Sequence, residues 1–293
     1  DMRLSTSANI YFNRPDGTKS AIERSVSLCA DAGYRVMDMN FYDCTSFKLP
    51  FVTEQWETWI HGIKDLAQSR GGEFSQAHAN FYNFCDPQAP DKEFLDRMVL
   101  RSIDCASILG VKWLVIHAGT DFDSPRLMAD SKRKNMEYFK PVIQHAAQKN
   151  VGIAIENLWD FNIAPKRRYT TTAEELVDLV DSLHKDFENV GICWDVEHAD
   201  IMQQAQGPAL RMIGSRLKAT HISDNVGVKY DHVLPFDGYT DWNAFMKLLK
   251  EIKYGGDFTY EIHRYTSQLP DAMVPAALRY SVEMGNYLLS LAE

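Results

Sequence analysis

Short apolar runs recur along the chain, with starts mostly 30 to 40 residues apart, and each has the length and composition of a β-strand. Several are rich in β-branched or aromatic residues and end in a polar side chain. We predict one strand from each run. The eight predicted strands cover Leu4–Tyr11, Arg35–Phe41, Phe74–Asn80, Trp113–Ala118, Gly152–Asn157, Gly191–Asp195, Leu217–Ile222 and Phe258–Ile262.

Helical patterns fill the segments between these runs. Gly33 and Gly110 each follow one pattern, where a C-terminal glycine is expected, and Thr53 precedes another as an expected N-cap. The predicted helices cover Ala21–Ala32, Glu54–Gln68, Lys92–Leu109, Lys132–Lys149, Ala173–Leu183, Trp242–Ile252 and Met273–Leu291, with a shorter helix near Pro208–Ile213.

Eight alternations of strand and helix predict an α/β fold, namely a (β/α)8 barrel that forms a single domain over residues 1–293. The main alternative is a doubly wound open sheet. Such a sheet would usually carry a glycine-rich phosphate loop after an early strand, and neither GxGxxG nor GxxxxGK[ST] occurs here. Gly255 and Gly256 precede the last strand, so we expect a turn at the amino-terminal face rather than a phosphate cradle.

The overall charge and the cysteines limit the partners and the cellular compartment that we expect for this protein. The formal net charge of −9 argues against nucleic acid or an anionic membrane as the main partner, since both favour clustered Lys and Arg. No apolar run reaches the roughly 18 residues of a membrane span, and the amino terminus lacks the pattern of a secretory signal. Five cysteines without a CxxC pair predict buried free thiols and a cytoplasmic location.

Four strand ends carry side chains that bind metals. Glu156, Asp195, His221 and Glu261 each lie near the end of an apolar run, and in a barrel these ends meet at one face. Three buried carboxylates repel one another unless a cation compensates. We therefore predict one divalent metal ion. Oxygen-rich donors with one imidazole favour Mn²⁺, with Mg²⁺, Co²⁺ or Zn²⁺ as alternatives.

This ligand set suits proton abstraction next to a carbonyl group. A metal ion could hold the carbonyl and a neighbouring hydroxyl and stabilise the enediolate formed when the adjacent proton leaves. Glu156 and Glu261 lie on strands five and eight, roughly opposite each other, and are the predicted acid/base pair. Return of the proton to the same carbon gives epimerisation, and return to the neighbouring carbon gives isomerisation.

The same segments resemble the xylose isomerase-like TIM barrel superfamily of sugar isomerases, ketose 3-epimerases, inosose dehydratases and endonuclease IV. The matching pieces occur in order and are AHANF, VIHAG, IAIEN, CWDVEHAD, THISDN with the following HVLPFDGYTDW, and YEIH. The resemblance implies that the shared metal ligands are Glu156, Asp195, His221 and Glu261. It further implies that His198, in the Asp-x-x-His pattern, occupies a position that contacts the substrate or a second metal ion, and we expect it to contact a substrate oxygen.

The expected substrate is a small sugar, polyol or keto-sugar. Its predicted contacts are His78, His117, Asn157, His198, His232 and Trp159. Trp159, Phe12, Phe41 and Trp113 are candidates for an aromatic wall against a sugar ring, although aromatic residues at strand ends more often belong to the core. Because barrels of this group often pair, the resemblance also allows a homo-oligomer.

Two positions depart from the ketose 3-epimerases. Asn162 stands where those enzymes have a second Glu, and Gly227 stands where they have an Arg, which argues against a free-ketose 3-epimerase. Three alternatives to an isomerase or epimerase therefore stay open. One is a dehydratase of the inosose type, one is a non-catalytic sugar-binding barrel, and the third is a zinc phosphodiesterase like endonuclease IV. Eight of that last family's nine ligands have counterparts here, but Tyr230 stands at the ninth.

Overall fold

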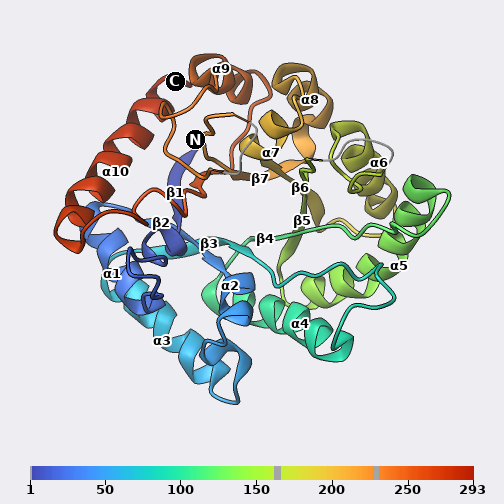
Figure 1. Cartoon of the computed structure of the whole chain (residues 1–293), viewed down its shortest axis with the longest axis horizontal. Coiled ribbons are helices and arrows are strands. Elements are labelled where there is room, and N and C mark those ends of the chain that lie inside the picture. The colour runs from blue at the N-terminus through green and yellow to red at the C-terminus, as the bar shows by residue number, and fades with distance from the viewer. Residues whose placement is uncertain (1, 162–165, 228–230) are drawn as a thin grey trace.

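A ring of eight parallel strands forms the centre of the molecule (Figure 1). The computed structural model describes residues 2–161, 166–227 and 231–293. The strands are β1 (Arg3–Ser7), β2 (Val36–Asn40), β3 (Glu73–His78), β4 (Trp113–Ile116), β5 (Gly152–Glu156), β6 (Val190–Asp195), β7 (Leu217–His221) and β8 (Asp257–Tyr260). They are hydrogen-bonded in the order β7-β6-β5-β4-β3-β2-β1-β8. A parallel bridge between Ile222 and Tyr260 joins the two remaining edges, so the ring is nearly closed.

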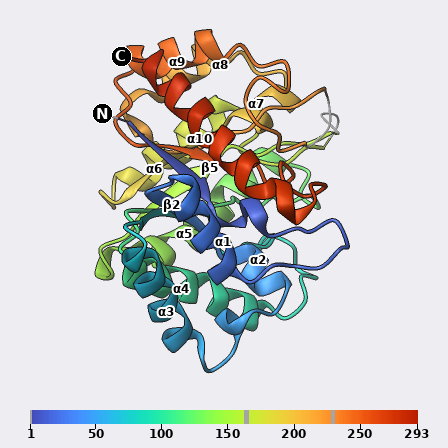
Figure 2. The same ribbon diagram turned by 90° about the vertical axis from the view of Figure 1, so that its left-hand side faces the viewer.

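Helices surround this ring on the outside (Figure 1), and both chain termini lie at the same end of the barrel (Figure 2). The α-helices are α1 (Ile22–Ala32), α2 (Phe41–Ser46), α3 (Trp56–Ser69), α4 (Lys92–Leu109), α5 (Leu127–Gln148), α6 (Ala173–His184), α7 (Val196–Ile201), α8 (Gln206–Ile213), α9 (Trp242–Glu251) and α10 (Val274–Ser290). The described residues also form the short 3₁₀ helices η1 (Ala8–Tyr11), η2 (Pro50–Val52), η3 (Gly214–Arg216) and η4 (Asp271–Met273). The predicted (β/α)8 barrel is thereby confirmed.

Local signals explain where most elements begin and end. Gly33 and Gly110 adopt left-handed backbone conformations, with φ of 116° and 84°, and end α1 and α4 as predicted. The side chain of Thr172 accepts the backbone N–H of Glu175 at the start of α6. Helix α3 begins at Trp56, two residues later than predicted, because the Thr53 hydroxyl accepts the N–H of Gln55 in the turn before the helix.

Several elements differ from the sequence prediction, and helix α5, for example, begins at Leu127, five residues before the predicted Lys132. The first strand ends at Ser7 rather than Tyr11, because the Ser7 side chain accepts the N–H of Asn9 and starts η1. Helices α2 and α7 were not predicted at all. Each has only six residues, too few to show a helical period, and each begins at a cap residue that ends a strand, Asn40 or Asp195.

Two layers of buried side chains fill the molecule. A large apolar layer lies between strands and helices, and a small cluster of Val115, Ala154, Cys193 and Ala219 fills part of the barrel interior. All five cysteines are buried and free, as predicted. Among the described residues, none of the helices combines the length and apolar character that crossing a bilayer requires.

Candidate metal centre

Four side chains from four successive strands meet at the carboxyl-terminal mouth of the barrel. Glu156, Asp195 and His221 are the last residues of β5, β6 and β7, and Glu261 directly follows β8. One ligand atom from each lies within 4.8 Å of all the others, and all four residues are buried. The structure thus brings together the complete ligand set predicted from the strand ends.

The two carboxylate oxygens of Asp195 have different roles, one in capping a helix and one in the cluster. Its Oδ1 accepts the backbone N–H of His198 at 2.8 Å and so caps α7. Its Oδ2 is buried and has no hydrogen-bond partner in the described part of the chain. An orphaned buried carboxylate oxygen is costly, and this one lies 4.0 Å from Nδ1 of His221 within the cluster.

Asn157 holds β5 and β6 in register beneath the cluster. Its side-chain amide donates to the carbonyl of Asp195 at 2.9 Å, and its side-chain oxygen accepts the Asp195 N–H at 2.7 Å. Both ends of the amide are therefore used by the backbone. The structure places Asn157 as a clamp for Asp195 rather than among the residues that line the open pocket.

Glu156 is the centre of a histidine cluster. Its Oε1 lies 2.8 Å from Nδ1 of His221, and its Oε2 lies 2.9 Å from Nε2 of His117 and 3.2 Å from Nε2 of His78. Burial acts to raise the pKa of Glu156, but the charge of His221 and hydrogen bonds from the three histidines hold that pKa well below its usual value. The side chain is thus an ionised acceptor.

The other two carboxyl groups have the opposite electrostatic environment. Burial, and then the charge of Glu156, raise the pKa of Asp195 well above its usual value. Burial, followed by the charges of Glu156 and Asp195, does the same for Glu261. A bound cation would offset this repulsion between the carboxyl groups, so the cluster has the electrostatics expected of a cation site.

His198 and His232 lie beside the cluster and border the same pocket. The Nδ1 of His198 is 2.7 Å from the carbonyl of Asn157, which can only accept a hydrogen bond. Burial lowers the pKa of His198 to about 3, so the ring is neutral and carries its proton on Nδ1. Nε2 is consequently an acceptor nitrogen.

Sequence reasoning missed the buried carboxylate that holds His232. Glu197 lies on α7 and accepts hydrogen bonds from the Ser223 hydroxyl at 2.9 Å and from the backbone N–H groups of Asp231 and His232. Its Oε2 is also 3.3 Å from Nδ1 of His232, a residue with a left-handed φ of 48°. Burial raises the pKa of Glu197 to about 7. An acidic residue two positions after the strand-end Asp195 was the available signal.

The pocket above the cluster has a volume of about 280 Å³. It is lined by His78, His117, Glu156, His198, His232 and Glu261, among other residues. Its aromatic lining differs from the prediction. Tyr42 and Phe81 stack with ring centroids 4.2 Å apart, and Phe81 lies 3.8 Å from the His117 ring. Each of the two residues comes directly after a predicted strand, Arg35–Phe41 or Phe74–Asn80, so a rule that considers only the last residues of each strand did not select them.

The four candidate aromatic residues do not form a wall, and two of them belong to the core, as aromatic residues at strand ends more often do. Phe12 and Phe41 are fully buried core residues, and Trp113, the first residue of β4, lies at the opposite end of the barrel. Trp159 packs near the site, 6.3 Å from the His198 ring and 4.7 Å from Phe161. The predicted positions Asn162 and Tyr230 lie outside the described residues, whereas Gly227 adopts a φ of 148° in the loop after β7.

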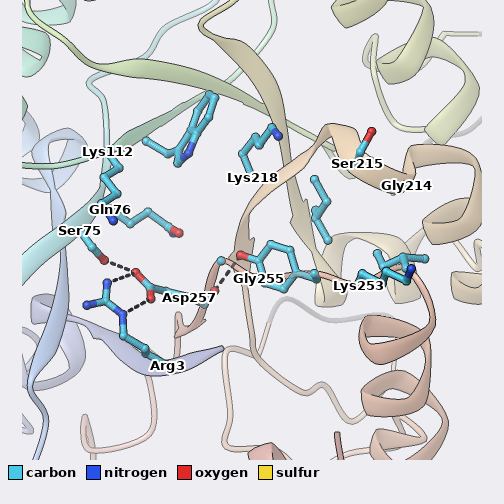
Figure 3. Close-up of a pocket in the computed structure, with 15 residues that line it drawn as sticks. Arg3, Ser75, Gln76, Lys112, Gly214, Ser215, Lys218, Lys253, Gly255 and Asp257 are labelled. Carbon is cyan, nitrogen blue, oxygen red and sulfur yellow. Dashed lines mark hydrogen bonds and ion pairs between the residues drawn. The ribbon is translucent and has the colours of Figure 1, made fainter. Parts of the chain in front are cut away.

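A larger pocket of about 800 Å³ lies at the amino-terminal end of the barrel (Figure 3). Gly255 and Gly256 border it, in the turn before β8 that the sequence predicted. Arg3 pairs with Asp257 at its edge. The carboxylates of the metal-type cluster lie at the other end of the strands.

Comparison with known proteins identifies relatives along most of the chain. The model of the family described as xylose isomerase-like TIM barrel matches residues 26–284. The protein y4fM of Sinorhizobium fredii, described as uncharacterised, is 29% identical over 208 residues, which cover 69% of this chain and 63% of that protein. The chain thus matches less than two thirds of that relative's length.

Solved structures share the architecture at low sequence identity. D-psicose 3-epimerase from Clostridium cellulolyticum H10 has a TM-score of 0.74 at 17% identity, over 98% of this chain and 99% of that one. The 3-keto-D-glucoside 4-epimerase YcjR from E. coli has a TM-score of 0.72 at 17% identity, over 97% of this chain and 100% of that one. At this identity the likeness establishes a common fold.

Proposed function

The chain belongs to the xylose isomerase-like TIM barrel family, and from this premise we propose that it is a carbohydrate isomerase or epimerase that uses a divalent metal ion. The observation that carries the proposal is the buried cluster of Glu156, Asp195, His221 and Glu261, whose ligand atoms lie within 4.8 Å of one another. The sugar epimerases with the same fold support the choice of substrate class.

The donor set fits a divalent ion. Three carboxylates and one imidazole match the preference of Mn²⁺ for oxygen-rich sites, and Mg²⁺, Co²⁺ and Zn²⁺ are the alternatives. The Oδ2 of Asp195 has no hydrogen-bond partner within the described residues and lies 3.6 Å from Nε2 of His198, so it is placed to serve as a ligand oxygen. When bound, such an ion supplies positive charge that polarises a carbonyl and stabilises negative charge on its oxygen.

The protein's own groups then move the proton. Glu156 and Glu261 both border the pocket, so one carboxylate can remove the proton next to a substrate carbonyl and the other can return one. His198 offers its Nε2 as an acceptor for a substrate hydroxyl, because its Nδ1 proton is already bonded to the Asn157 carbonyl. His78, His117 and His232 are the proposed further substrate contacts, together with Trp159 at greater distance.

The size of the pocket supports a small substrate. Sites for drug-sized ligands occupy about 300–1,000 Å³, and the volume of about 280 Å³ here lies just below that range. A single sugar unit suits this space better than an oligosaccharide. The stacked pair of Tyr42 and Phe81 offers an apolar surface for one face of a sugar ring.

A specific observation favours a second candidate function. His78, His117 and Glu156 also form a group able to hold a metal ion, next to the first. Additional ions at this place would support hydrolysis of a phosphodiester in the manner of endonuclease IV, the alternative raised by the sequence. The net charge of −9 weighs against a nucleic-acid substrate.

Elemental analysis of the purified protein separates the two candidates. About one Mn, Co, Mg or Zn ion per chain is expected for the isomerase or epimerase, whereas two or three zinc ions per chain favour the phosphodiesterase. A panel of sugars and keto-sugars is then incubated with the protein in D₂O. Deuterium incorporated next to the carbonyl is the expected result, and Glu261→Gln should abolish it. Full activity of that variant would overturn the proposed mechanism.

A further inference from the structure

One acidic side chain lies inside the barrel directly below the metal-type cluster. Successive residues of a strand alternate in direction, so the inward position below Asn40 at the end of β2 is Asp38. The corresponding positions on β5, β6 and β7 hold Ala154, Cys193 and Ala219. Asp38 is only 2% exposed. A buried carboxylate among small apolar residues is costly unless its neighbours use its charge.

The side chain of Asp38 lies close to His221. Its Oδ2 has no hydrogen-bond partner among the residues that the structure describes. The nearest ring nitrogen is Nε2 of His221, at 4.0 Å. The other nitrogen of that ring, Nδ1, faces the cluster and lies 2.8 Å from Glu156 and 3.6 Å from Glu261. His221 is therefore located between Asp38 on one side and the metal-type ligands on the other.

Neighbouring side chains hold both Asp38 and His221 in place. Gln76 makes a side-chain hydrogen bond to Asp38, and its own amide is fixed by the carbonyl of Thr220 at 3.2 Å and the hydroxyl of Thr259 at 3.3 Å. Figure 3 shows Gln76 reaching inward from the amino-terminal side. The His221 ring lies nearly parallel to that of His78, at an angle of 11° and 5.5 Å between centroids. Its rotation is thus restricted.

A neutral imidazole binds a metal ion through one nitrogen and keeps its proton on the other. For His221, the nitrogen that faces the ligands is Nδ1, so the proton must be on Nε2. A carboxylate next to that N–H stabilises this tautomer and makes Nδ1 a stronger donor. At 4.0 Å the attraction is electrostatic rather than a hydrogen bond.

We propose that Asp38 is a positioning residue of the metal site, which acts through His221 by favouring the tautomer with its proton on Nε2. This inference rests on the proposed function, since it requires a metal ion at the cluster. Asp38 is not one of the residues whose ligand atoms form the cluster, so it would act on the metal site only through His221. This role would also explain why an acidic residue is buried in the barrel interior.

The test compares Co²⁺ binding by isothermal titration calorimetry and the visible absorption of the Co²⁺-loaded protein. Asp38→Leu should bind Co²⁺ 10- to 100-fold more weakly than the unmodified protein. Asp38→Asn keeps an acceptor oxygen and should lose less affinity, and it also serves if the leucine variant does not fold. Both should change the absorption bands, which report on how His221 is held.

Asp43→Asn is the matched control. It removes another carboxylate that borders the site, but that carboxylate is bonded to the side chain of Asn9 and not directed at a ligand. Its Co²⁺ affinity should stay within about threefold of the unmodified protein. Unchanged affinity or unchanged absorption in the Asp38 variants, or an equal loss in Asp43→Asn, would overturn the role of Asp38. If the unmodified protein itself takes up no Co²⁺, the proposed function fails first and the inference fails with it.

Discussion

Replacing Glu261 by Gln should stabilise the metal-free protein and, at the same time, reduce the extra stability that a bound metal ion provides. Without metal, the substitution removes one of three buried carboxylates that repel one another, so the free energy of unfolding should rise. With metal, it removes a charged ligand, so the stabilisation that the ion provides should shrink. A residue that served only to pack the barrel would not produce this combination of a more stable metal-free protein and a smaller stabilisation by the metal ion.

The geometry sets the size of both effects. Two unit charges 4.8 Å apart repel by about 3.5 kcal/mol at an effective dielectric constant of about 20. An unfolding entropy of about 2.1 cal/mol/K per residue corresponds to about 0.6 kcal/mol/K for 293 residues. Removing one repulsion of this size therefore raises the Tm of the metal-free protein by about 6 °C. Protonation of the cluster makes the observed rise smaller.

The metal-loaded protein gives the second value. An ion at 100 times its Kd stabilises the fold by about 2.7 kcal/mol, which corresponds to a rise in Tm of about 4 °C. If Glu261→Gln weakens binding a hundredfold, the same concentration provides only about 0.4 kcal/mol, and the rise falls below about 1 °C.

Differential scanning calorimetry of chelator-treated protein, with and without Mn²⁺, measures both quantities. The control is Glu283→Gln, which changes an exposed residue of α10 and should leave both Tm values as they are. If Glu261→Gln lowered the metal-free Tm, the argument from repulsion would be refuted. If Mn²⁺ raised the Tm of the variant as much as that of the unmodified protein, Glu261 would not be a ligand.

Three further predictions concern the pH dependence of metal binding, the contact of His198 with the substrate, and the contribution of Asp224 to stability. The Mn²⁺-induced rise in Tm should increase from mildly acidic to neutral pH, because the raised pKa values of Asp195 and Glu261 let protons compete with the ion; calorimetry at several pH values measures this. His198→Ala should raise KM for a sugar substrate about three- to tenfold, by loss of one hydrogen bond, with little change in Mn²⁺ affinity; kinetics and titration calorimetry check it. Asp224→Ala should destabilise the protein by about 3 kcal/mol, because three backbone N–H groups and the Trp242 indole lose their acceptor; thermal unfolding measures the loss.

Each of these has a clear opposite outcome. A metal-free protein whose own stability rose through the same pH range would contradict the first, since raised carboxyl pKa values mean that the folded state binds more protons than the unfolded chain. A large loss of Mn²⁺ affinity in His198→Ala would make that residue a metal ligand. An unchanged Tm in Asp224→Ala would mean that the loop after β7 is held by other contacts.

The sequence by itself determined the barrel and selected the four candidate metal ligands. All eight strands were recognisable, because a buried parallel strand is a continuous apolar run and glycines such as Gly33 and Gly110 end the helices between strands. The rule that barrel sites lie at strand carboxyl ends then selected Glu156, Asp195, His221 and Glu261, which the structure brings within 4.8 Å. These predictions depend only on local composition and on one general property of the fold.

The tertiary structure alone decided what surrounds that set. Asn157 turned out to clamp two strands, Trp113 lies at the opposite end of the barrel, and Tyr42 and Phe81 line the pocket instead. The role proposed for Asp38 likewise depends on which ring nitrogen of His221 it faces. Such relations arise between residues far apart in the chain, whose approach depends on strand register, alternating side-chain direction and packing. No local pattern encodes them, so they become visible only when the ring of strands is closed.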